Sequence, residues 1–317
     1  MIIHRDGWQY SGRVPAFFPG QAGCFCCTAA VAGTYCIFYG DSSRSGTLVR
    51  DTESWVSDTW TSRTDAPSPA RDGHSTATCN LKAYSFGGVQ SSSPYYMPDT
   101  EEFVLSSDTW TSKTDNTVSK TYDNAATVSE KAYIIAGFVS GSYSQRTDEY
   151  DAGGDTFSNK TACPSPARRG NVCYSYSGVV YSMMTDFSRD NDAYTVASDT
   201  WASKTDGPTP TRFTRSGFGL GEYGYVIAGS GSGVALRDND RYSSSGDSWT
   251  AKADILSPGR TGCASFGNSS SMAGYITGGD DFSATMKAHQ EYVDDTWTSR
   301  ADIPTPARRG AGAAESA

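Results

Sequence analysis

The feature of this sequence that most restricts its fold is a short aromatic motif repeated along the chain. Clear copies read DTWTSRTD at 58–65, DTWTSKTD at 108–115, DTWASKTD at 199–206 and DTWTSRAD at 295–302. The aromatic residue recurs every 44 to 52 residues, at Trp8, Trp60, Trp110, Phe157, Trp201, Trp249 and Trp297. Self-similarity at this period predicts a repeat architecture.

Each repeat contains segments that alternate in polarity and end at turn residues. In the repeat around 67–110, we expect strands at 73–79, 82–86 and 101–105, with a fourth beginning at Trp110. The second strand ends at Gly87-Gly88, where a positive φ or close packing is expected. In the first and sixth repeats, fewer residues separate the third strand from the repeated Trp (WVSDTW and YVDDTW). This shortening predicts tighter hairpins there.

The composition supports strands and turns rather than helices. Ser, Thr, Gly, Tyr and Val are abundant in the 317 residues, and Gly alone numbers 33. The formal net charge of −9 argues against a nucleic-acid partner, because binding to phosphates needs a basic surface. No apolar run is long enough to insert into a membrane. The start, MIIHRDGWQYSG, has no apolar signal-peptide core, so we expect a protein made in the cytosol.

The order of the motifs resembles Kelch repeats. It runs from an aromatic with a following Asp to P-x-P-x-R, then Y-x-x-x-G-G, E-Y and D-T-W, over nearly the whole chain. The resemblance implies an all-β fold, a Kelch-type β-propeller of four-stranded blades around a central channel. It implies a single domain at 1–317, with repeat units at approximately 13–62, 63–112, 113–159, 160–203, 204–251 and 252–299.

Two closures of the ring are open. A six-bladed ring would use the terminal pieces, 1–12 and 300–317, to complete or cover one equivalent strand. A seven-bladed ring would leave the last blade incomplete. We favour six blades, because a half-blade would expose unpaired strand edges.

Most of the eight cysteines follow the Gly after the Pro/Arg loop, as in Gly262-Cys263, which places them on one strand of each repeat. We interpret them as small buried residues of a tight strand. Disulfides or a metal site are the alternative, although no pair has C-x-x-C spacing.

A repeated arginine is the first candidate site. Symmetry would place these residues in a ring on the face that carries the loops from fourth to first strands, where guanidiniums can hold carboxylate, sulfate or phosphate. Alternatively, each arginine pairs with a local aspartate such as Asp65, Asp206, Asp254 or Asp302 and packs between blades. The candidates are Arg71, Arg168, Arg212, Arg260 and Arg308.

The loops between second and third strands share that face and vary most between repeats. Variable loops on a fixed scaffold are where binding usually occurs. Six of their residues are candidate anchors for a partner, or else lids folded onto their own blades: Tyr95, Tyr96, Met97, Tyr143, Phe187 and Phe282.

The sequences RDND at 189–192 and RDND at 237–240 occupy one structural position, so Asp190, Asp192, Asp238 and Asp240 are weak candidates for calcium. The flanking arginines oppose cation binding, and turn capping is favoured. We expect no cofactor. His4, His74 and His289 form no recognised catalytic motif.

We therefore expect a non-catalytic binding or structural propeller. The nearly identical units resemble Kelch-like arrays of tailed-phage virion proteins and bacterial surface proteins. That resemblance implies a virion component (tail, neck or fibre) whose variable loops contact another protein subunit, a copy of itself or a host glycan. The alternatives are a sugar-active enzyme, similar to galactose oxidase or to sialic-acid mutarotases, and a cytosolic protein-interaction adaptor.

Overall fold

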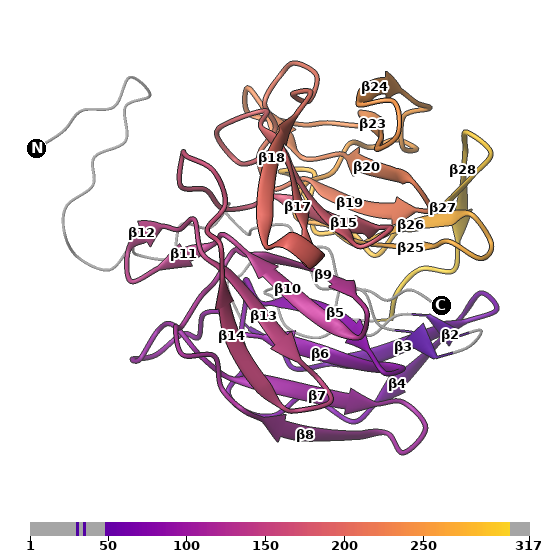
Figure 1. The fold of residues 1–317 in the computed structure, drawn as a ribbon. Coiled ribbons are helices and arrows are strands. Elements are labelled where there is room, and N and C mark those ends of the chain that lie inside the picture. Colours follow the sequence, from indigo (N-terminus) through magenta and orange to yellow (C-terminus); the bar gives the residue numbers. More distant parts are fainter. Residues whose placement is uncertain (1–29, 32–33, 36–47, 305–317) are drawn as a thin grey trace, which may run out of the picture.

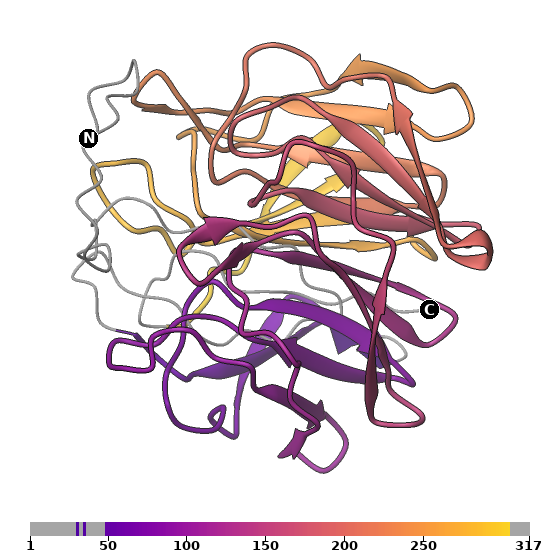
Figure 2. The same ribbon diagram turned by 60° about the vertical axis from the view of Figure 1, so that its left-hand side comes forward.

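The computed structural model describes residues 30–31, 34–35 and 48–304 (Figure 1). In this part of the chain the strands form six antiparallel four-stranded sheets, which follow one another around a centre in order of sequence (Figure 1, Figure 2). The one helix among these residues is a 3-10 turn, η1 (Val196–Ser198), and none of them forms a helix able to cross a membrane. The prediction of an all-β propeller with four-stranded sheets is confirmed.

Five of the sheets have strands of four or five residues throughout, and we number all sheets in sequence order. Sheet 2 contains β5 (Ser75–Cys79), β6 (Lys82–Phe86), β7 (Thr100–Val104) and β8 (Thr109–Lys113). Sheet 3 contains β9 (Asn124–Val128), β10 (Lys131–Ile135), β13 (Thr147–Asp151) and β14 (Thr156–Lys160). Sheet 4 contains β15 (Val172–Tyr176), β16 (Val179–Met183), β17 (Asn191–Thr195) and β18 (Thr200–Lys204).

Sheet 5 contains β19 (Ser216–Leu220), β20 (Tyr223–Ile227), β23 (Asn239–Ser243) and β24 (Ser248–Ala251). Sheet 6 contains β25 (Ala264–Asn268), β26 (Ala273–Thr277), β27 (His289–Val293) and β28 (Thr296–Arg300). Two small hairpins extend from the loops: β11 (Phe138–Val139) with β12 (Ser142–Tyr143), and β21 (Ser230–Gly231) with β22 (Val234–Ala235).

Sheet 1 differs from the others. It contains β1 (Ala30–Val31), β2 (Thr34–Tyr35), β3 (Thr52–Val56) and β4 (Thr59–Arg63), so only two of its strands reach full length. The described residues thus form five full-length sheets where the sequence predicted six blades. Residues 36–47, between β2 and β3, lie outside the described residues.

The repeated aromatic motif joins each sheet to the one before it. At the junction of sheets 3 and 4, the indole Nε1 of Trp201 donates to the carbonyl oxygen of Thr161 at 2.9 Å. The N–H of Thr161 donates to the Asp199 carboxylate, also at 2.9 Å. The tryptophan therefore lies between neighbouring sheets.

The same contacts close the ring. Trp60 of sheet 1 donates to the carbonyl oxygen of Ala301, which follows sheet 6, and the N–H of Ala301 donates to Asp58, each at 2.8 Å. Because sheets 6 and 1 bond directly, no further blade fits between them, and the alternative of seven blades is wrong. Of the closure pieces, 1–12 and 305–317 lie outside the described residues.

The short hairpins predicted for the first and sixth repeats are confirmed. Two residues connect β3 to β4, and both have positive φ (Ser57 47°, Asp58 62°). Asp294 and Asp295 connect β27 to β28, and both also have positive φ. Two consecutive positive φ values define the turn whose twist matches that of the flanking strands.

The second glycine of the doublet lies close to neighbouring residues in sheets 2 and 3. A Cβ on Gly88 would lie 2.9 Å from the carbonyl oxygen of Asp72, and one on Gly137 would lie 2.8 Å from the Cβ of Asp123. Both residues have φ near +100°. At the first position alanine is accepted, since Ala136 occupies it with φ 65°. In sheet 2 the first glycine is also closely packed, because a Cβ on Gly87 would lie 2.4 Å from the carbonyl oxygen of Lys120. The first position thus varies between sheets, and the second keeps its glycine at Gly88 and Gly137.

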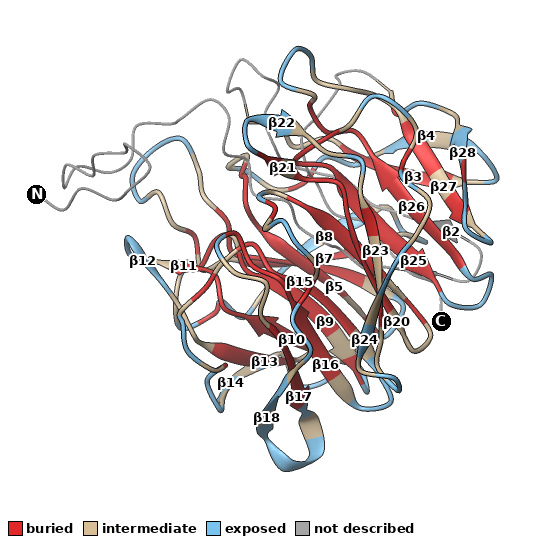
Figure 3. Cartoon of the chain, turned by 90° about the horizontal axis from the view of Figure 1, so that it is seen from above, coloured by how far each residue is buried: buried red, intermediate tan, exposed pale blue. Residues whose placement is uncertain are grey.

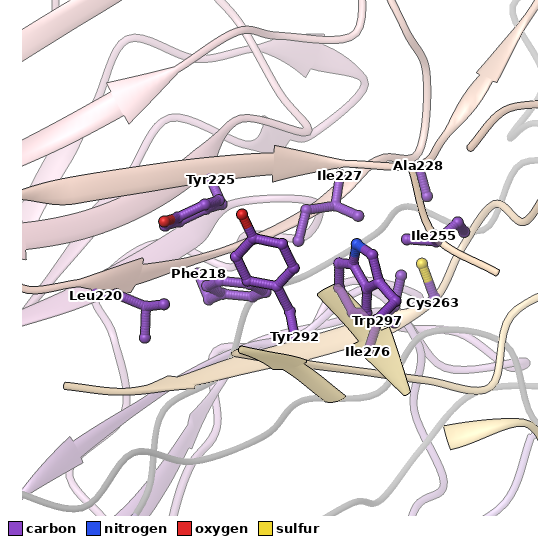
Figure 4. Close-up of a cluster of buried hydrophobic side chains, with 10 residues drawn as sticks. All are labelled: Phe218, Leu220, Tyr225, Ile227, Ala228, Ile255, Cys263, Ile276, Tyr292 and Trp297. Carbon is purple, nitrogen blue, oxygen red and sulfur yellow. The ribbon is translucent and has the colours of Figure 1, made fainter. Parts of the chain in front are cut away.

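The hydrophobic core lies between adjacent sheets. Inner strands are mostly buried, whereas outer strands such as β8 and β14 are largely exposed (Figure 3). At the junction of sheets 5 and 6, Tyr292 and Trp297 pack against Tyr225 and Ile227 (Figure 4). The described cysteines are all buried, as predicted: Cys79, Cys163, Cys173 and Cys263. Cys24, Cys26, Cys27 and Cys36 lie outside the described residues.

Replacing Trp201 by Phe should lower the free energy of unfolding by about 1 kcal/mol, the usual contribution of one hydrogen bond. The ring would stay, as it does naturally at Phe157. Replacing Trp201 by Ala should cost about 3 kcal/mol, because packing is lost as well. Urea denaturation measures both. Thr200→Ala, on the same strand and exposed, is the control and should change stability by less than about 0.5 kcal/mol. Equal losses for the Phe and Ala variants would contradict the assignment of the hydrogen bond.

Acid should weaken the junctions between sheets. Hydrogen bonds from Tyr194 and from the backbone of Thr161 hold the pKa of Asp199 below its ordinary value, and the N–H of Ala253 lowers the pKa of Asp295. A lowered folded-state pKa stabilises the fold above the unfolded value of about 3.9, and this stabilisation is lost as pH falls through the folded-state pKa. Denaturation midpoints at pH 7 and pH 3 should therefore differ less in Asp199→Asn than in the parent protein.

Candidate functional site

The loops that can carry a site lie on one face of the propeller. In an antiparallel four-stranded sheet, the connection from second to third strand and the connection to the next sheet leave from the same end. The hairpins β11–β12 and β21–β22 both lie on this side (Figure 3). We call it the loop face. In sheets 2 to 6 it is formed by 64–74, 87–99, 114–123, 136–146, 161–171, 184–190, 205–215, 228–238, 252–263 and 278–288.

The repeated arginines are placed inside this face rather than on it. Arg168 bonds Asp192 and Arg212 bonds Asp240, each at 2.6 Å. Arg71 lies 3.3 Å from Asp99. All these guanidiniums are buried. Their partners belong to the third strand of the same sheet or the residues just before it, not to the aspartates at 65, 206 or 254 that the sequence suggested.

Arg260 has a different environment, because the position of the third-strand carboxylate is taken by Gln290. Its Nη1 donates to the carbonyl oxygens of Gly278 and Ala288, and burial lowers the pKa of the guanidinium. These four arginines therefore connect strands within a sheet, and in the structure they form no open ring. Arg308 lies outside the described residues.

The weak calcium candidates are also engaged within the protein. Asp192 and Asp240 accept hydrogen bonds from the buried arginines, and Asp190 accepts one from Ser188. The carbonyl oxygen of Asp238 accepts from Arg212. Among the residues that the structure describes, no three metal-binding side chains gather.

The predicted loop anchors divide into buried and exposed residues. Met97 is buried, and Tyr95 and Tyr96 are half-buried. In contrast, Tyr143 and Phe187 expose 40% and 56% of their surface. Phe282 of sheet 6 is also exposed. The loop face thus combines lids with open aromatic side chains, and both interpretations of these loops apply to different residues.

Aromatic rings from four consecutive sheets form a continuous row on the loop face. The ring centroids of Tyr96 and Phe138 are 6.2 Å apart, and those of Phe138 and Tyr143 are 5.6 Å apart. Phe187 follows Tyr143 at 5.4 Å, and Phe213 follows Phe187 at 5.5 Å. We call Tyr143, Phe187 and Phe213, the three exposed rings, the ring ladder.

The backbone at each ring of the ladder is fixed by local hydrogen bonds. Tyr143 pairs with Phe138 in the β11–β12 hairpin. The hydroxyl of Thr185 accepts the N–H groups of Phe187 and Ser188, which makes a compact turn. Phe213 exchanges two backbone hydrogen bonds of 2.8 Å with Ser230. The rings are therefore presented on ordered loops.

Sequence reasoning did not find Phe213. It follows the arginine of the P-x-P-x-R motif, and its equivalents in sheets 2, 3, 4 and 6 are Asp72, Thr121, Arg169 and Thr261. Variation at one position directly after a repeated motif was the available signal. The same position supplies Arg169, the next important residue of the site.

An ionic cluster lies beside the ring ladder. Asp186 pairs with Arg169 at 3.2 Å and with Arg215 at 3.6 Å. The Arg169 guanidinium lies over three aromatic rings, 5.1 Å from the centroid of Tyr122 and 5.6 Å from those of Phe138 and Tyr143. We call Arg169, Asp186 and Arg215 the mouth cluster. Its two cations and one anion leave one net positive charge.

The mouth cluster marks a break in the repeat. Backbone hydrogen bonds of 2.8 to 2.9 Å link sheets 2 and 3, 3 and 4, and 5 and 6 around the centre. In these bonds the N–H of Tyr122 donates to the carbonyl oxygen of Gly73, that of Gly170 to Tyr122 and that of Gly262 to Thr214. Between sheets 4 and 5, the N–H of Thr214 instead faces the Asp186 carboxylate at 3.4 Å. Departures from a regular pattern are where functional sites are expected.

The titratable groups buried nearby do not supply an acid–base histidine. Burial lowers the pKa of His74 and of His289 to about 3, so both are neutral at physiological pH. Burial raises the pKa of Asp123 to about 6, against the opposing effect of Lys120. Among these groups, Asp123 is the one that can change charge near neutral pH.

Comparison with known proteins places the fold but not the function. No protein-family model matches the chain, and no curated protein matches its sequence. Its structure is similar to the solved structure of YjhT, with a TM-score of 0.69 and 12% sequence identity. The match covers 89% of this chain and 98% of that one. At this identity the likeness shows the propeller fold alone, and membership of the Kelch family stays a prediction.

Replacing Arg168 by Met should lower the free energy of unfolding by about 3–5 kcal/mol, because Asp192 would be left buried and uncompensated. Arg169→Met, one residue along and only half-buried, should cost about 1 kcal/mol or less. Urea denaturation of both variants measures the difference. Similar small losses for the two would show that Arg168 is not needed within its sheet.

Proposed function

We propose that this protein is a carbohydrate-binding propeller whose ligand lies on the ring ladder and the mouth cluster of the loop face. The observation that carries the proposal is the row of exposed aromatic rings with a cation held against it. Contiguous exposed apolar groups bordered by polar residues mark interaction sites on soluble proteins. The loops of the other described sheets show no comparable row of contacting exposed rings.

A sugar fits this combination of groups. A pyranose ring has a face of C–H groups, which packs on an aromatic ring, and an edge of hydroxyls, which accept and donate hydrogen bonds. Tyr143, Phe187 and Phe213 offer the flat apolar surfaces. The guanidinium donors of Arg169, which is half-buried, can satisfy hydroxyls at the edge, and the buried Asp186 carboxylate holds that guanidinium in place.

The site is ordered before a ligand arrives. Arg169 packs over Tyr143 and Phe138, and a cation on an aromatic face contributes about 0.5–1 kcal/mol at exposed sites. The backbone hydrogen bonds of Phe187 and Phe213 restrict their loops. A preorganised site loses less conformational entropy on binding, which favours affinity for a small polar ligand.

The virion component that the sequence resemblance implies would be one case of this function, in which the bound sugar belongs to a host surface. It rests on the resemblance of the repeats to phage and surface arrays and stays a prediction. Binding to another protein subunit or to a second copy of the chain is likewise an expectation from sequence.

A sugar-active enzyme is the second candidate, and the position of Asp186 favours it. A carboxylate beside a sugar site can take a proton from a hydroxyl and return it, which is general acid–base catalysis. The guanidinium of Arg169, which is half-buried, would stabilise the negative charge that develops on a sugar oxygen, whereas Arg215 is buried and pairs with Asp186. The likeness to YjhT agrees with either candidate, because it concerns the fold.

Two assays separate binding from catalysis. Nuclear magnetic resonance of equilibrating sugar anomers detects interconversion, and oxygen consumption detects sugar oxidation. If the protein is an enzyme, turnover should be present and Asp186→Asn should reduce it at least about a hundredfold, the contribution of a general base. Binding without turnover in either assay would leave the binding function.

Replacing Tyr143 or Phe187 by Ala should weaken glycan binding at least about tenfold, since each removes a stacking surface worth more than 1 kcal/mol. A glycan array identifies the ligand, and calorimetry measures its affinity. Both side chains are exposed, so stability should change by less than about 1 kcal/mol. Tyr176→Ala is the matched control, because this tyrosine is equally exposed (43%) but lies at the opposite end of its sheet. Unchanged affinity in both ladder variants would refute the proposed site.

A further inference from the structure

The ring ladder has a regular spacing that limits the kind of ligand it fits. Its three rings come from the loops of sheets 3, 4 and 5, one from each. The centroid of Phe187 is 5.4 Å from that of Tyr143 and 5.5 Å from that of Phe213. Each step is close to the length that one sugar unit occupies in a linked chain of pyranoses.

We propose that the ring ladder binds an oligosaccharide of at least three linked pyranose units, one on each ring, lying across sheets 3 to 5. This inference rests on the proposed carbohydrate-binding function and deepens it. A single sugar could cover one ring only, and it would leave the other two exposed to water. A linked chain covers all three and buries the apolar surface of each.

The tilt of the rings restricts the linkage. The ring planes of Tyr143 and Phe187 make an angle of 45°, and those of Phe187 and Phe213 make an angle of 74°. A flat, ribbon-like chain presents parallel faces and cannot stack on rings that turn this much. A chain that turns at each linkage can follow them, as α1,4-linked and β1,3-linked glucans do.

The ladder has a defined end at sheet 3. Beyond Tyr143 the row continues to Phe138, which is 5% exposed and therefore offers little surface to a ligand. Arg169 lies against both of these rings. The sugar on Tyr143 would therefore be the terminal unit of the bound segment, with its hydroxyls within reach of the guanidinium. Because the ladder has three rings, we expect the affinity for oligosaccharides to stop rising after about three units.

The test is a calorimetric titration of the full chain with oligosaccharides of one to six units, in α1,4-, β1,3- and β1,4-linked series of glucose. We expect affinity to rise roughly tenfold with each added unit up to three, as for one ring stacked on one aromatic side chain, and then to level off. The best series should be one that turns. Phe187→Ala should bring the affinity for three units close to that for one, because it interrupts the ladder at its centre.

Several results would overturn the inference. Equal affinity for one and three units, or tightest binding of the flat β1,4-linked series, would exclude an extended turning chain while leaving carbohydrate binding in place. If neither these sugars nor any glycan of an array binds, the proposed function fails together with the inference. Tyr176→Ala, outside the loop face, is the control and should keep the length dependence of the parent protein.

Discussion

Each sheet is held to its neighbour by an aspartate carboxylate that accepts a backbone N–H across the junction. The same hydrogen bond recurs at all six junctions between the described sheets. Its acceptors are Asp58, Asp108, Asp155, Asp199, Asp247 and Asp295. A four-stranded sheet cannot bury both of its faces alone, so it is stable only between neighbours. The hydrogen bond that the Ala301 N–H donates to Asp58 makes this dependence cyclic, because it joins the last described sheet to the first.

This closed ring leaves the loop face free to vary. Buried arginines connect the strands of sheets 2, 4, 5 and 6, in three of them through a carboxylate, and they remove repeated charges from the surface. The other residues of the loop face differ from sheet to sheet. Sheets 3 to 5 carry the ring ladder, and the junction of sheets 4 and 5 replaces a backbone acceptor with the Asp186 carboxylate. The strongest departure from the repeat and the exposed aromatic rings occur in the same region.

Much of the fold was predictable from local patterns. The strand at 82–86 and the tight turn at Ser57-Asp58 follow from alternation and loop length, which act over a few residues. The partners of the arginines were not predictable in this way. Arg168 bonds Asp192, 24 residues further along the chain, because β17 returns to the same end of the sheet. The nearby aspartates suggested by the sequence belong to other positions of the loop.

The sequence by itself determined the repeat, the four strands of each unit and the aromatic residue at every junction, since these depend on periodicity and on short-range turn chemistry. Only the tertiary structure decided which loop residues reach the solvent. Met97 and Phe187 are both apolar loop residues, but the first is buried and the second is half exposed. Loops have no periodicity from which burial follows. The contact between Phe187 and Phe213 joins two sheets, and it exists only because the ring places their loops side by side.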